Sequence, residues 1–165
     1  MLIVSDTTPI ISLVKVNYLN ILKLLFGKIL IPEAVYNELT ENPIYVEEAE
    51  QIRNCDFILC KPVHNKEAVK ILRNVTGLDA GESEAIVLYD ELNADFLIMD
   101  ERKGRKIAKQ LELKHVGTIG ILIQAFDEKI IDKNDIERCL AIFKEKGIRI
   151  SDTLYQYVMK HIKGN

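Results

Sequence analysis

Residues 2–6, Leu-Ile-Val-Ser-Asp, form a short apolar run that ends in an aspartate, and residues 96–100, Phe-Leu-Ile-Met-Asp, repeat this pattern. Continuous apolar runs of this length, bounded by polar residues, are typical of strands buried on both faces. Similar runs lie at 28–31, 57–59 and 115–116, and longer stretches with helical periodicity separate them. Because strands that alternate with helices indicate βαβ units, we expect an α/β fold built on a parallel sheet.

The stretches between these strands carry helix start and stop signals, such as prolines at 9 and 32 and a glycine at 27. No repeat, low-complexity segment or linker interrupts the chain, so we expect one α/β domain over 1–128 and a helical C-terminal extension, 129–165, packed on the same domain. The expected helices cover 9–16, 18–26, 32–39, 44–54, 65–74, 82–92, 101–111, 119–128, 133–146 and 152–162.

Composition excludes several classes of protein. The 165 residues are 48% hydrophobic and 28% charged, which is ordinary for a globular domain and excludes a disordered chain. No apolar run approaches the roughly 18 residues of a membrane span, and the first residues lack the basic segment of a signal peptide. The three cysteines form no Cys-x-x-Cys pair, so neither a disulfide framework nor a zinc site is indicated. We expect a cytoplasmic protein that does not bind membranes.

The net charge of −3 argues against coating nucleic acid by bulk charge, but it hides a segregation along the chain. Residues 76–100 carry seven acids and no lysine or arginine, whereas residues 101–115 carry six bases and two acids. Two readings of this junction stay open at this point. It marks either two solvated helix faces or an acidic site beside a basic surface.

Four carboxylates are candidates for one site. In an open parallel sheet, ligands bind at the carboxyl ends of the strands, and Asp6 and Asp100 stand at two such ends. Glu38 lies about two turns into the helix that Pro32 opens, and Glu82 opens a helix directly after a glycine. Glu84 is kept in reserve, because two residues apart on a helix point to nearly opposite sides.

Each of these acids also has a structural explanation. Asp6 precedes a helix and is a candidate N-cap, and Asp100 before Arg102 is another. Glu82 lies in a first helical turn, where the helix dipole favours acids by about 0.3–1 kcal/mol. Glu38 is equally explained as a surface glutamate. The four together are harder to explain in this way than any one alone.

A cluster of carboxylates has to be neutralised. Two carboxylates about 4 Å apart repel by roughly 4 kcal/mol at an effective dielectric constant of 20, so a group of four protonates, spreads apart or binds a divalent cation. Oxygen ligands without histidine or cysteine suit Mg²⁺ or Mn²⁺, which activate water in phosphoryl displacement. The pattern therefore indicates a metal-dependent nuclease or phosphotransferase. A phosphatase with Asp6 as nucleophile is disfavoured, because position 8 is Thr and the Asp-x-Asp spacing is absent.

The order of these motifs resembles the PIN-domain family. The resemblance runs from about residue 2 to residue 123, and the Gly-Ile-Arg-Ile-Ser stretch at 147–151 is similar to the ending of one branch of bacterial and archaeal members. The motif order as a whole resembles the VapC-like toxin–antitoxin ribonucleases. The matching stretches are Ile-Val-Ser-Asp-Thr-Thr-Pro (3–9), Ile-Leu-Ile-Pro-Glu-Ala-Val-Tyr-Asn-Glu-Leu (29–39), Leu-Asp-Ala-Gly-Glu-Ser-Glu-Ala-Ile (78–86), Ala-Asp-Phe-Leu-Ile-Met-Asp-Glu-Arg-Lys-Gly-Arg-Lys-Ile-Ala (94–108) and Val-Gly-Thr-Ile-Gly-Ile-Leu (116–122).

This resemblance implies a three-layer α/β/α fold with a central parallel sheet, a Mg²⁺- or Mn²⁺-dependent ribonuclease activity and a homodimer. Many small members are toxins of type II toxin–antitoxin pairs, each inhibited by a small antitoxin protein that blocks the acidic pocket. The catalytic acids carried over by position are Asp6, Glu38, Glu82 and Asp100. Glu82 falls where many members have aspartate, which marks a divergent branch.

In the implied mechanism an RNA phosphodiester is hydrolysed. Asp6, Glu82 and Asp100 would hold the metal, and Glu38 would complete the acidic ring and orient the attacking water. Thr8 is a candidate hydrogen-bond partner of Asp6, with a helix-start role as the alternative. The candidate phosphate contacts are Arg102, Lys103 and Arg105. The alternative to catalysis is a PIN-like module that binds RNA or a protein through the same crevice.

Overall fold

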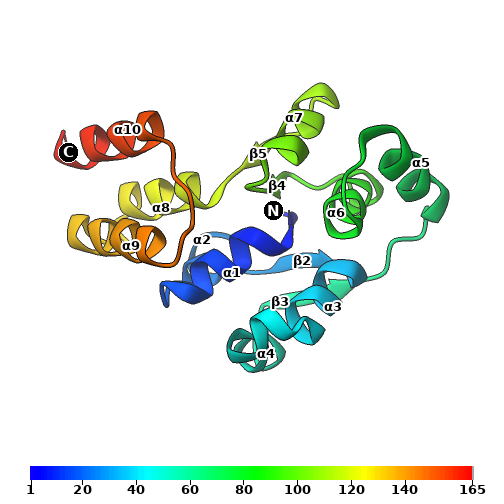
Figure 1. Ribbon diagram of the computed structural model, residues 1–165, viewed down its shortest axis with the longest axis horizontal. Helices are drawn as coiled ribbons and strands as arrows, with labels where there is room; N and C mark the ends of the chain where they lie inside the picture. Colours follow the sequence, from blue (N-terminus) through cyan, green and yellow to red (C-terminus); the bar gives the residue numbers. More distant parts are fainter. Residues whose placement is uncertain (165) are drawn as a thin grey trace.

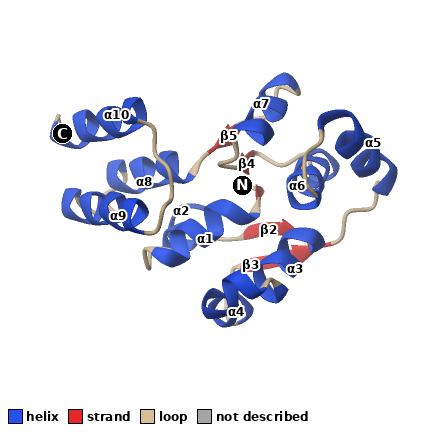
Figure 2. Ribbon diagram, viewed as in Figure 1, coloured by secondary structure: helices blue, strands red, loops and turns tan. Residues whose placement is uncertain are grey.

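The computed structural model describes residues 1–164 and contains a five-stranded sheet flanked by helices (Figures 1 and 2). The strands are β1 (Ile3–Ser5), β2 (Ile29–Pro32), β3 (Ile58–Lys61), β4 (Phe96–Ile98) and β5 (His115–Val116). The helices are α1 (Thr7–Lys15), α2 (Asn20–Phe26), α3 (Glu33–Glu41), α4 (Val46–Arg53), α5 (Lys66–Thr76), α6 (Ala80–Leu92), α7 (Arg102–Gln110), α8 (Thr118–Asp127), α9 (Lys133–Glu145) and α10 (Asp152–Lys163), with a 3₁₀ turn, η1, at Pro43–Tyr45.

All strand pairs in the sheet are parallel, and the strand order is β3-β2-β1-β4-β5. The chain leaves β1 toward β2 and β3 on one side and returns to β4 and β5 on the other. The strand order therefore reverses between β1 and β4, where Ser5 is in register with Ile98. This is the place where open α/β sheets form their binding crevice.

Alternate residues of the central strands face two different cores. Ile3 and Ile98 belong to the cluster packed against α1, α2, α8, α9 and α10, whereas Val4 and Leu97 belong to the cluster packed against α5, α6 and α7. Because successive side chains of a strand point to opposite faces, this alternation shows that both faces of the sheet are covered. The predicted three-layer α/β/α fold with a parallel sheet is confirmed.

The last two helices pack on the end of the molecule formed by α8, at the left of Figure 1. Val158 and Ile162 of α10 and Phe143 of α9 are buried in the same cluster as the strand residues Ile3 and Ile98. On α10, His161 Nε2 lies 2.7 Å from Asp127 Oδ1 of α8. The division into 1–128 and 129–165 stays a prediction, and residue 165 lies outside the described residues.

Two helix starts differ from the sequence-based expectation. Pro9 is the third residue of α1 rather than the first, because the helix already begins at Thr7. Pro32 is the last residue of β2 and stands at the N-cap position of α3, so α3 begins at Glu33. Both prolines are tolerated because the backbone N–H groups of a first helical turn need no partner within the helix.

Among the described residues, no single helix is long and apolar enough to cross a membrane; α1 and α2 together pass that test by length and composition, but their axes are bent by 118° at the break. The three cysteines are free thiols: Cys139 is buried, Cys55 is half-buried and Cys60 is exposed.

Candidate functional site

The site is built around Asp6, at the carboxyl end of β1 and beside the point where the strand order reverses. The backbone N–H of Asp6 donates to the Ile98 carbonyl at 3.0 Å, which fixes the end of β1 against β4. Asp6 is only 3% exposed. It stands at the N-cap position of α1, yet its side chain makes no cap hydrogen bond. The capping explanation therefore does not account for this buried carboxylate.

Burial raises the pKa of the Asp6 carboxyl from 3.8 to about 7. The negative charges of Asp79, Glu82 and Glu38 act in the same direction, and the backbone N–H of Thr7 acts against them. Burial penalises the charged form and nearby like charges repel it, so both causes point to a crowded acidic pocket. Three other carboxylates thus act electrostatically on Asp6.

Asp79 and Glu82 are joined in a capping box at the start of α6. The backbone N–H of Glu82 donates to Asp79 Oδ1 at 2.8 Å, and the backbone N–H of Asp79 donates to Glu82 Oε2 at 3.0 Å. A Cβ atom on Gly81, between them, would lie 3.4 Å from Asp6 Oδ1 and 3.5 Å from Asp79 Oδ1. These are ordinary contact distances, so the first turn of α6 lies directly beside the Asp6 carboxylate.

Glu82 is buried, and burial raises its pKa above the usual value. The charges of Asp79 and Glu101 add to this shift, while the Asp79 backbone N–H and the Lys103 ammonium oppose it. Another glycine makes room for this side chain, because a Cβ on Gly104 of α7 would come within 2.8 Å of Glu82 Oε1.

Glu84 faces a different part of the molecule. Its Oε2 accepts a hydrogen bond from the Ala34 backbone N–H at 3.0 Å, and its Oε1 lies 3.3 Å from Lys66 Nζ. These contacts tie α6 to α3 and α5. Of the two glutamates considered from the sequence, Glu82 is the one whose charge acts on Asp6.

Glu38 is positioned by a hydroxyl group of the neighbouring helix. Thr7 Oγ1 donates to Glu38 Oε2 at 2.7 Å, which links the first residue of α1 to the middle of α3. Thr7 is buried and Glu38 is half-buried. The threonine hydroxyl that reaches an acid here is therefore that of Thr7, one residue before the Thr8 considered from the sequence.

Asp100 follows β4, but its carboxylate is held by the start of α8. The Thr118 backbone N–H donates to Asp100 Oδ1 at 2.8 Å, and Thr118 Oγ1 donates to Oδ2 at 2.5 Å. Because β1 and β4 are neighbours, Asp6 and Asp100 follow adjacent strands at the same end of the sheet, and the Asp100 carboxylate bonds to the first residue of α8.

The predicted basic residues lie at the start of α7, and all three are exposed. Lys103 Nζ donates to the Gly77 carbonyl at 2.6 Å and so joins α7 to the end of α5. Arg105 Nη1 lies 3.5 Å from the position that a Cβ on Gly117 would take, close to the region of Asp100. Arg102 opens the helix. The start of α7 therefore lies near Glu82 through Lys103 and near Asp100 through Arg105. We call the carboxyl end of the sheet that carries Asp6, Glu38, Asp79, Glu82 and Asp100 the acidic edge.

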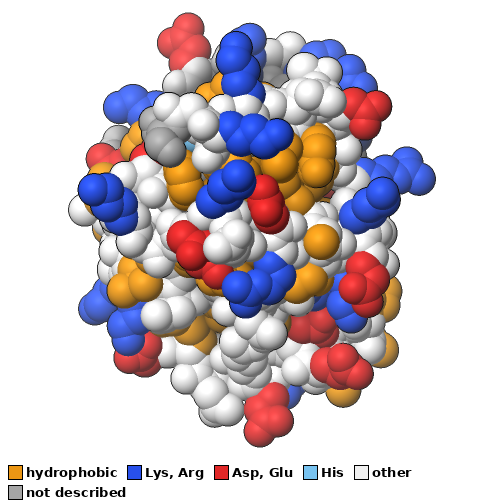
Figure 3. All heavy atoms as spheres, turned by 90° about the vertical axis from the view of Figure 1, so that its left-hand side faces the viewer, with side chains coloured by type: hydrophobic (Ala, Val, Ile, Leu, Met, Phe, Trp, Pro, Cys, Tyr) orange, Lys and Arg blue, Asp and Glu red, His pale blue; other side chains and the backbone are white. Residues whose placement is uncertain are grey.

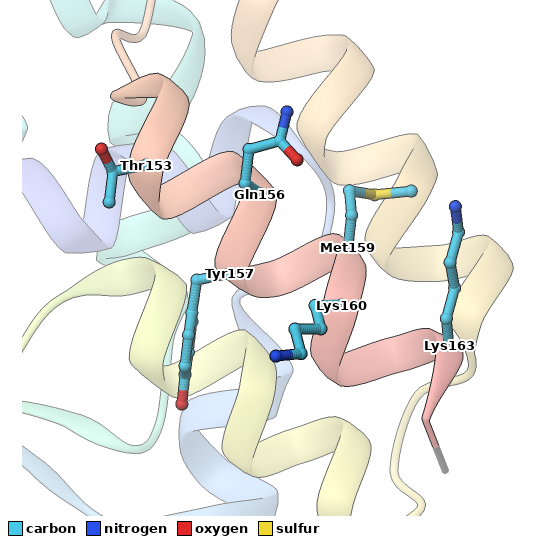
Figure 4. A pocket seen from close by; sticks show the side chains of 6 residues that line it. All are labelled: Thr153, Gln156, Tyr157, Met159, Lys160 and Lys163. Carbon is cyan, nitrogen blue, oxygen red and sulfur yellow. The ribbon is translucent and has the colours of Figure 1, made fainter.

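Two cavities lie elsewhere on the protein. One, of about 490 Å³, is lined by α10 residues that include Tyr157, Lys160 and Lys163 (Figure 4). The end of the molecule formed by α8, α9 and α10 carries apolar side chains in patches between charged ones (Figure 3). The other cavity, of about 510 Å³, is lined by α5, α6 and Leu111 and Leu113. Neither lining includes a predicted catalytic acid.

Among residues 1–164, no group of three or more His, Cys, Asp or Glu side chains is arranged to hold a metal ion. Partners already bind some of the acids: Glu82 accepts from Asp79, and Asp100 accepts from Thr118. The chemistry of the donors nevertheless suits Mg²⁺ or Mn²⁺, because Asp6 and the three side chains named as acting on its pKa, Asp79, Glu82 and Glu38, are all carboxylates. The residue types therefore fit a hard divalent cation.

Comparison with protein families gives a match to one family model, described as a PIN domain, over residues 2–164. The chain belongs to the PIN-domain family. A comparison with curated proteins and one with solved structures gave no significant match. PIN domains are generally nucleases that use divalent metals, so this chain has a nuclease-type fold. The match spans the α8–α10 end as well as the sheet.

In this PIN domain the sequence-based reasoning missed Asp79. It treated residues 76–81 as a loop and began the helix at Glu82, whereas α6 begins at Ala80 with Asp79 as its N-cap. The signal was present, because an aspartate followed three residues later by glutamate is the pattern of a capping box. Asp79 contributes to the electrostatics of both Asp6 and Glu82.

Proposed function

We propose that this PIN domain is a metal-dependent endoribonuclease that hydrolyses RNA phosphodiester bonds. The observation that carries the proposal is Asp6, which is buried at the point where the strand order reverses and has its pKa raised to about 7 beside Asp79, Glu82 and Glu38. Perturbed carboxylates in such a crevice are typical of functional sites, because structural stability gains nothing from their mutual repulsion.

Asp6, Glu82 and Asp100 are the residues that would hold Mg²⁺ or Mn²⁺. When bound, such an ion neutralises charge on the phosphate and lowers the pKa of a bound water. Glu38, whose Oε2 is fixed by Thr7 Oγ1, would orient the attacking water through its other oxygen. Asp79 keeps Glu82 in place through the capping box and adds negative charge beside Asp6.

The RNA backbone would lie along the start of α7. Arg102 and Arg105 are exposed there, and a guanidinium group can bind a phosphate through two parallel hydrogen bonds. Lys103 already donates to the Gly77 carbonyl, and its positive charge opposes the rise in the pKa of Glu82. It would therefore link the phosphate contacts to the acidic pocket.

We also propose the role of toxin in a type II toxin–antitoxin pair, with a small antitoxin as inhibitor and a homodimer as the assembly. The support for these partners is the family membership together with the VapC-like motif order described above. The toxin role, the antitoxin and the homodimer are separate proposals from the RNA hydrolysis, which depends only on the carboxylates described above.

The test is cleavage of single-stranded RNA by purified protein with Mn²⁺, with Mg²⁺ and with EDTA. We expect metal-dependent cleavage that Asp6→Asn and Asp100→Asn each reduce by about 100-fold or more, because each removes a charge from the metal site. Asp56→Asn is the matched control, since Asp56 is exposed and pairs with Lys23 at 2.9 Å. Equal cleavage by Asp6→Asn and Asp56→Asn would identify a contaminating nuclease.

A non-catalytic PIN-like module that binds RNA or a protein is the second candidate. It is favoured by the structural partners of two acids: Glu82 lies in a capping box and Asp100 is bound by Thr118. The two candidates differ in their response to metal. A catalytic site predicts a rise in the melting temperature with millimolar Mn²⁺, and a module without a metal site predicts none.

A further inference from the structure

The carboxylate of Asp100 is held at both oxygens by one residue. Thr118 is 4% exposed; its backbone N–H binds Oδ1 at 2.8 Å and its hydroxyl binds Oδ2 at 2.5 Å. Two donors on one carboxylate fix its rotation about the Cβ–Cγ bond as well as its position. Thr118 is also the first residue of α8, so the Asp100 carboxylate lies at the N-terminus of that helix.

Gly117 makes this approach possible. A Cβ atom at position 117 would lie 2.7 Å from Asp100 Oδ1, closer than real Cβ contacts occur. The φ angle of Gly117 is −102°, which any residue can adopt. The glycine is therefore required by the space that the Asp100 carboxylate occupies and not by the backbone conformation.

We propose that Thr118 is a positioning residue for Asp100. It holds the carboxylate in one position and one orientation at the end of β4, so that a divalent cation meets a ligand that is already oriented. This proposal rests on the proposed function, in which Asp100 is a metal ligand. Hydrogen bonds from the protein to ligating carboxylates commonly set metal affinity in this way.

A purely structural role has to be distinguished from positioning. Gly117, at the N-cap position of α8, supplies no side-chain cap, so Asp100 also serves the first turn of α8 as a remote capping group. If capping were the whole role of the pair, loss of the Thr118 hydroxyl would lower stability and leave the metal response unchanged. The metal response is therefore the decisive readout.

The experiment compares Thr118→Val, which loses the hydroxyl, with Thr118→Ser, which keeps it. For each we would measure the Mn²⁺ concentration for half-maximal RNA cleavage, the melting temperature without metal and its rise on adding Mn²⁺. Thr40→Val is the matched control, because Thr40 is also buried and its hydroxyl donates to the Tyr36 carbonyl within α3, at 2.8 Å.

We expect Thr118→Val to raise the half-saturating Mn²⁺ concentration about 10- to 100-fold and to reduce the Mn²⁺-induced rise in melting temperature. Thr118→Ser should stay close to the wild type, and Thr40→Val should lose stability with an unchanged Mn²⁺ requirement. In an Asp100→Asn background, Thr118→Val should have no further effect on the Mn²⁺ response, because it acts through Asp100.

An unchanged Mn²⁺ requirement in a folded Thr118→Val variant would overturn the proposal and leave the proposed function intact. A wild type that neither cleaves RNA nor gains stability with Mn²⁺ would overturn both. Should Thr118→Val fail to fold, Gly117→Ala provides a second route, because its Cβ displaces the Asp100 carboxylate while the Thr118 hydroxyl is kept. The same rise in the Mn²⁺ requirement is expected there.

Discussion

At the scale of single residues, two aspartates with the same sequence pattern have different environments. Asp6 and Asp100 each end an apolar strand, and their strands are neighbours in the sheet. Asp6 is buried among other carboxylates, whereas Asp100 is half-buried and receives two hydrogen bonds from Thr118. Of these two aspartates, Asp6 is therefore the one whose pKa is raised by burial and by neighbouring carboxylates.

Because the pKa of Asp6 is raised to about 7 in the folded chain, folded Asp6 keeps a proton that the unfolded chain loses near pH 4. The unfavourable contribution of Asp6 to the free energy of unfolding is absent below about pH 4, grows as pH rises and is complete above about pH 7. The raised pKa of Glu82 adds a contribution of the same sign. Without metal, the free energy of unfolding of Asp6→Asn minus that of the wild type should increase by about 2–3 kcal/mol from pH 5 to pH 8. Urea unfolding at both pH values measures this difference.

A difference between variant and wild type that does not change with pH would contradict the buried, crowded state of Asp6. The control is Asp56→Asn, because Asp56 is an exposed surface residue and its replacement should give a difference that is the same at pH 5 and pH 8.

The sequence predicted which strands end in carboxylates, since an apolar run followed by aspartate is a local pattern. It did not predict which partners these carboxylates find. The hydroxyl of Thr118 and the hydroxyl of Thr7 reach Asp100 and Glu38 only because distant segments meet in the fold. Lys103 was predicted as a phosphate contact, a role that stays a prediction, while its bond to the Gly77 carbonyl depends on how α5 and α7 meet.

At the scale of elements, the start of α6 combines a structural and an electrostatic role. Its capping box stabilises the helix, and the same two carboxylates raise the pKa of Asp6. Helix α9 begins with an equivalent capping box, Asp132 and Asp135, but there Arg138 Nη2 lies 2.9 Å from Asp135. The chain therefore contains two similar helix starts, of which one is crowded by acids and one is balanced by a base.

We expect Asp79→Asn to raise the free energy of unfolding of the metal-free protein by about 0.5–1 kcal/mol. Asparagine caps a helix about as well as aspartate, so the substitution removes repulsion and keeps the cap. Asp132→Asn, the matched variant on α9, should change stability by less than about 0.5 kcal/mol. Metal-free denaturant unfolding of both variants tests the expectation. An Asp79→Asn variant less stable than wild type would show that the negative charge of Asp79 at the start of α6 stabilises the helix more than it repels the neighbouring acids.

At the scale of the whole molecule, the C-terminal helices share the main core. Val158 of α10 is 1% exposed and belongs to the same cluster as Ile3 of the central strand, and α10 packs against α8. A shared core links the unfolding of its parts, because neither part can keep its apolar surface buried alone. We therefore expect residues 129–164 to unfold together with the sheet, in spite of the predicted boundary near residue 128.

We expect Val158→Ala to lower the free energy of unfolding by about 1.5–3 kcal/mol, because it removes buried methyl groups and leaves a cavity. Tyr155→Ala on the same helix should cost much less, since Tyr155 is 44% exposed. The loss should appear as a lower denaturant midpoint with an unchanged m-value, and hydrogen exchange should show α10 and β1 opening together. If α10 instead exchanges at a lower denaturant concentration than β1, residues 129–164 form a separate cooperative unit, and the shared apolar cluster does not couple them to the sheet.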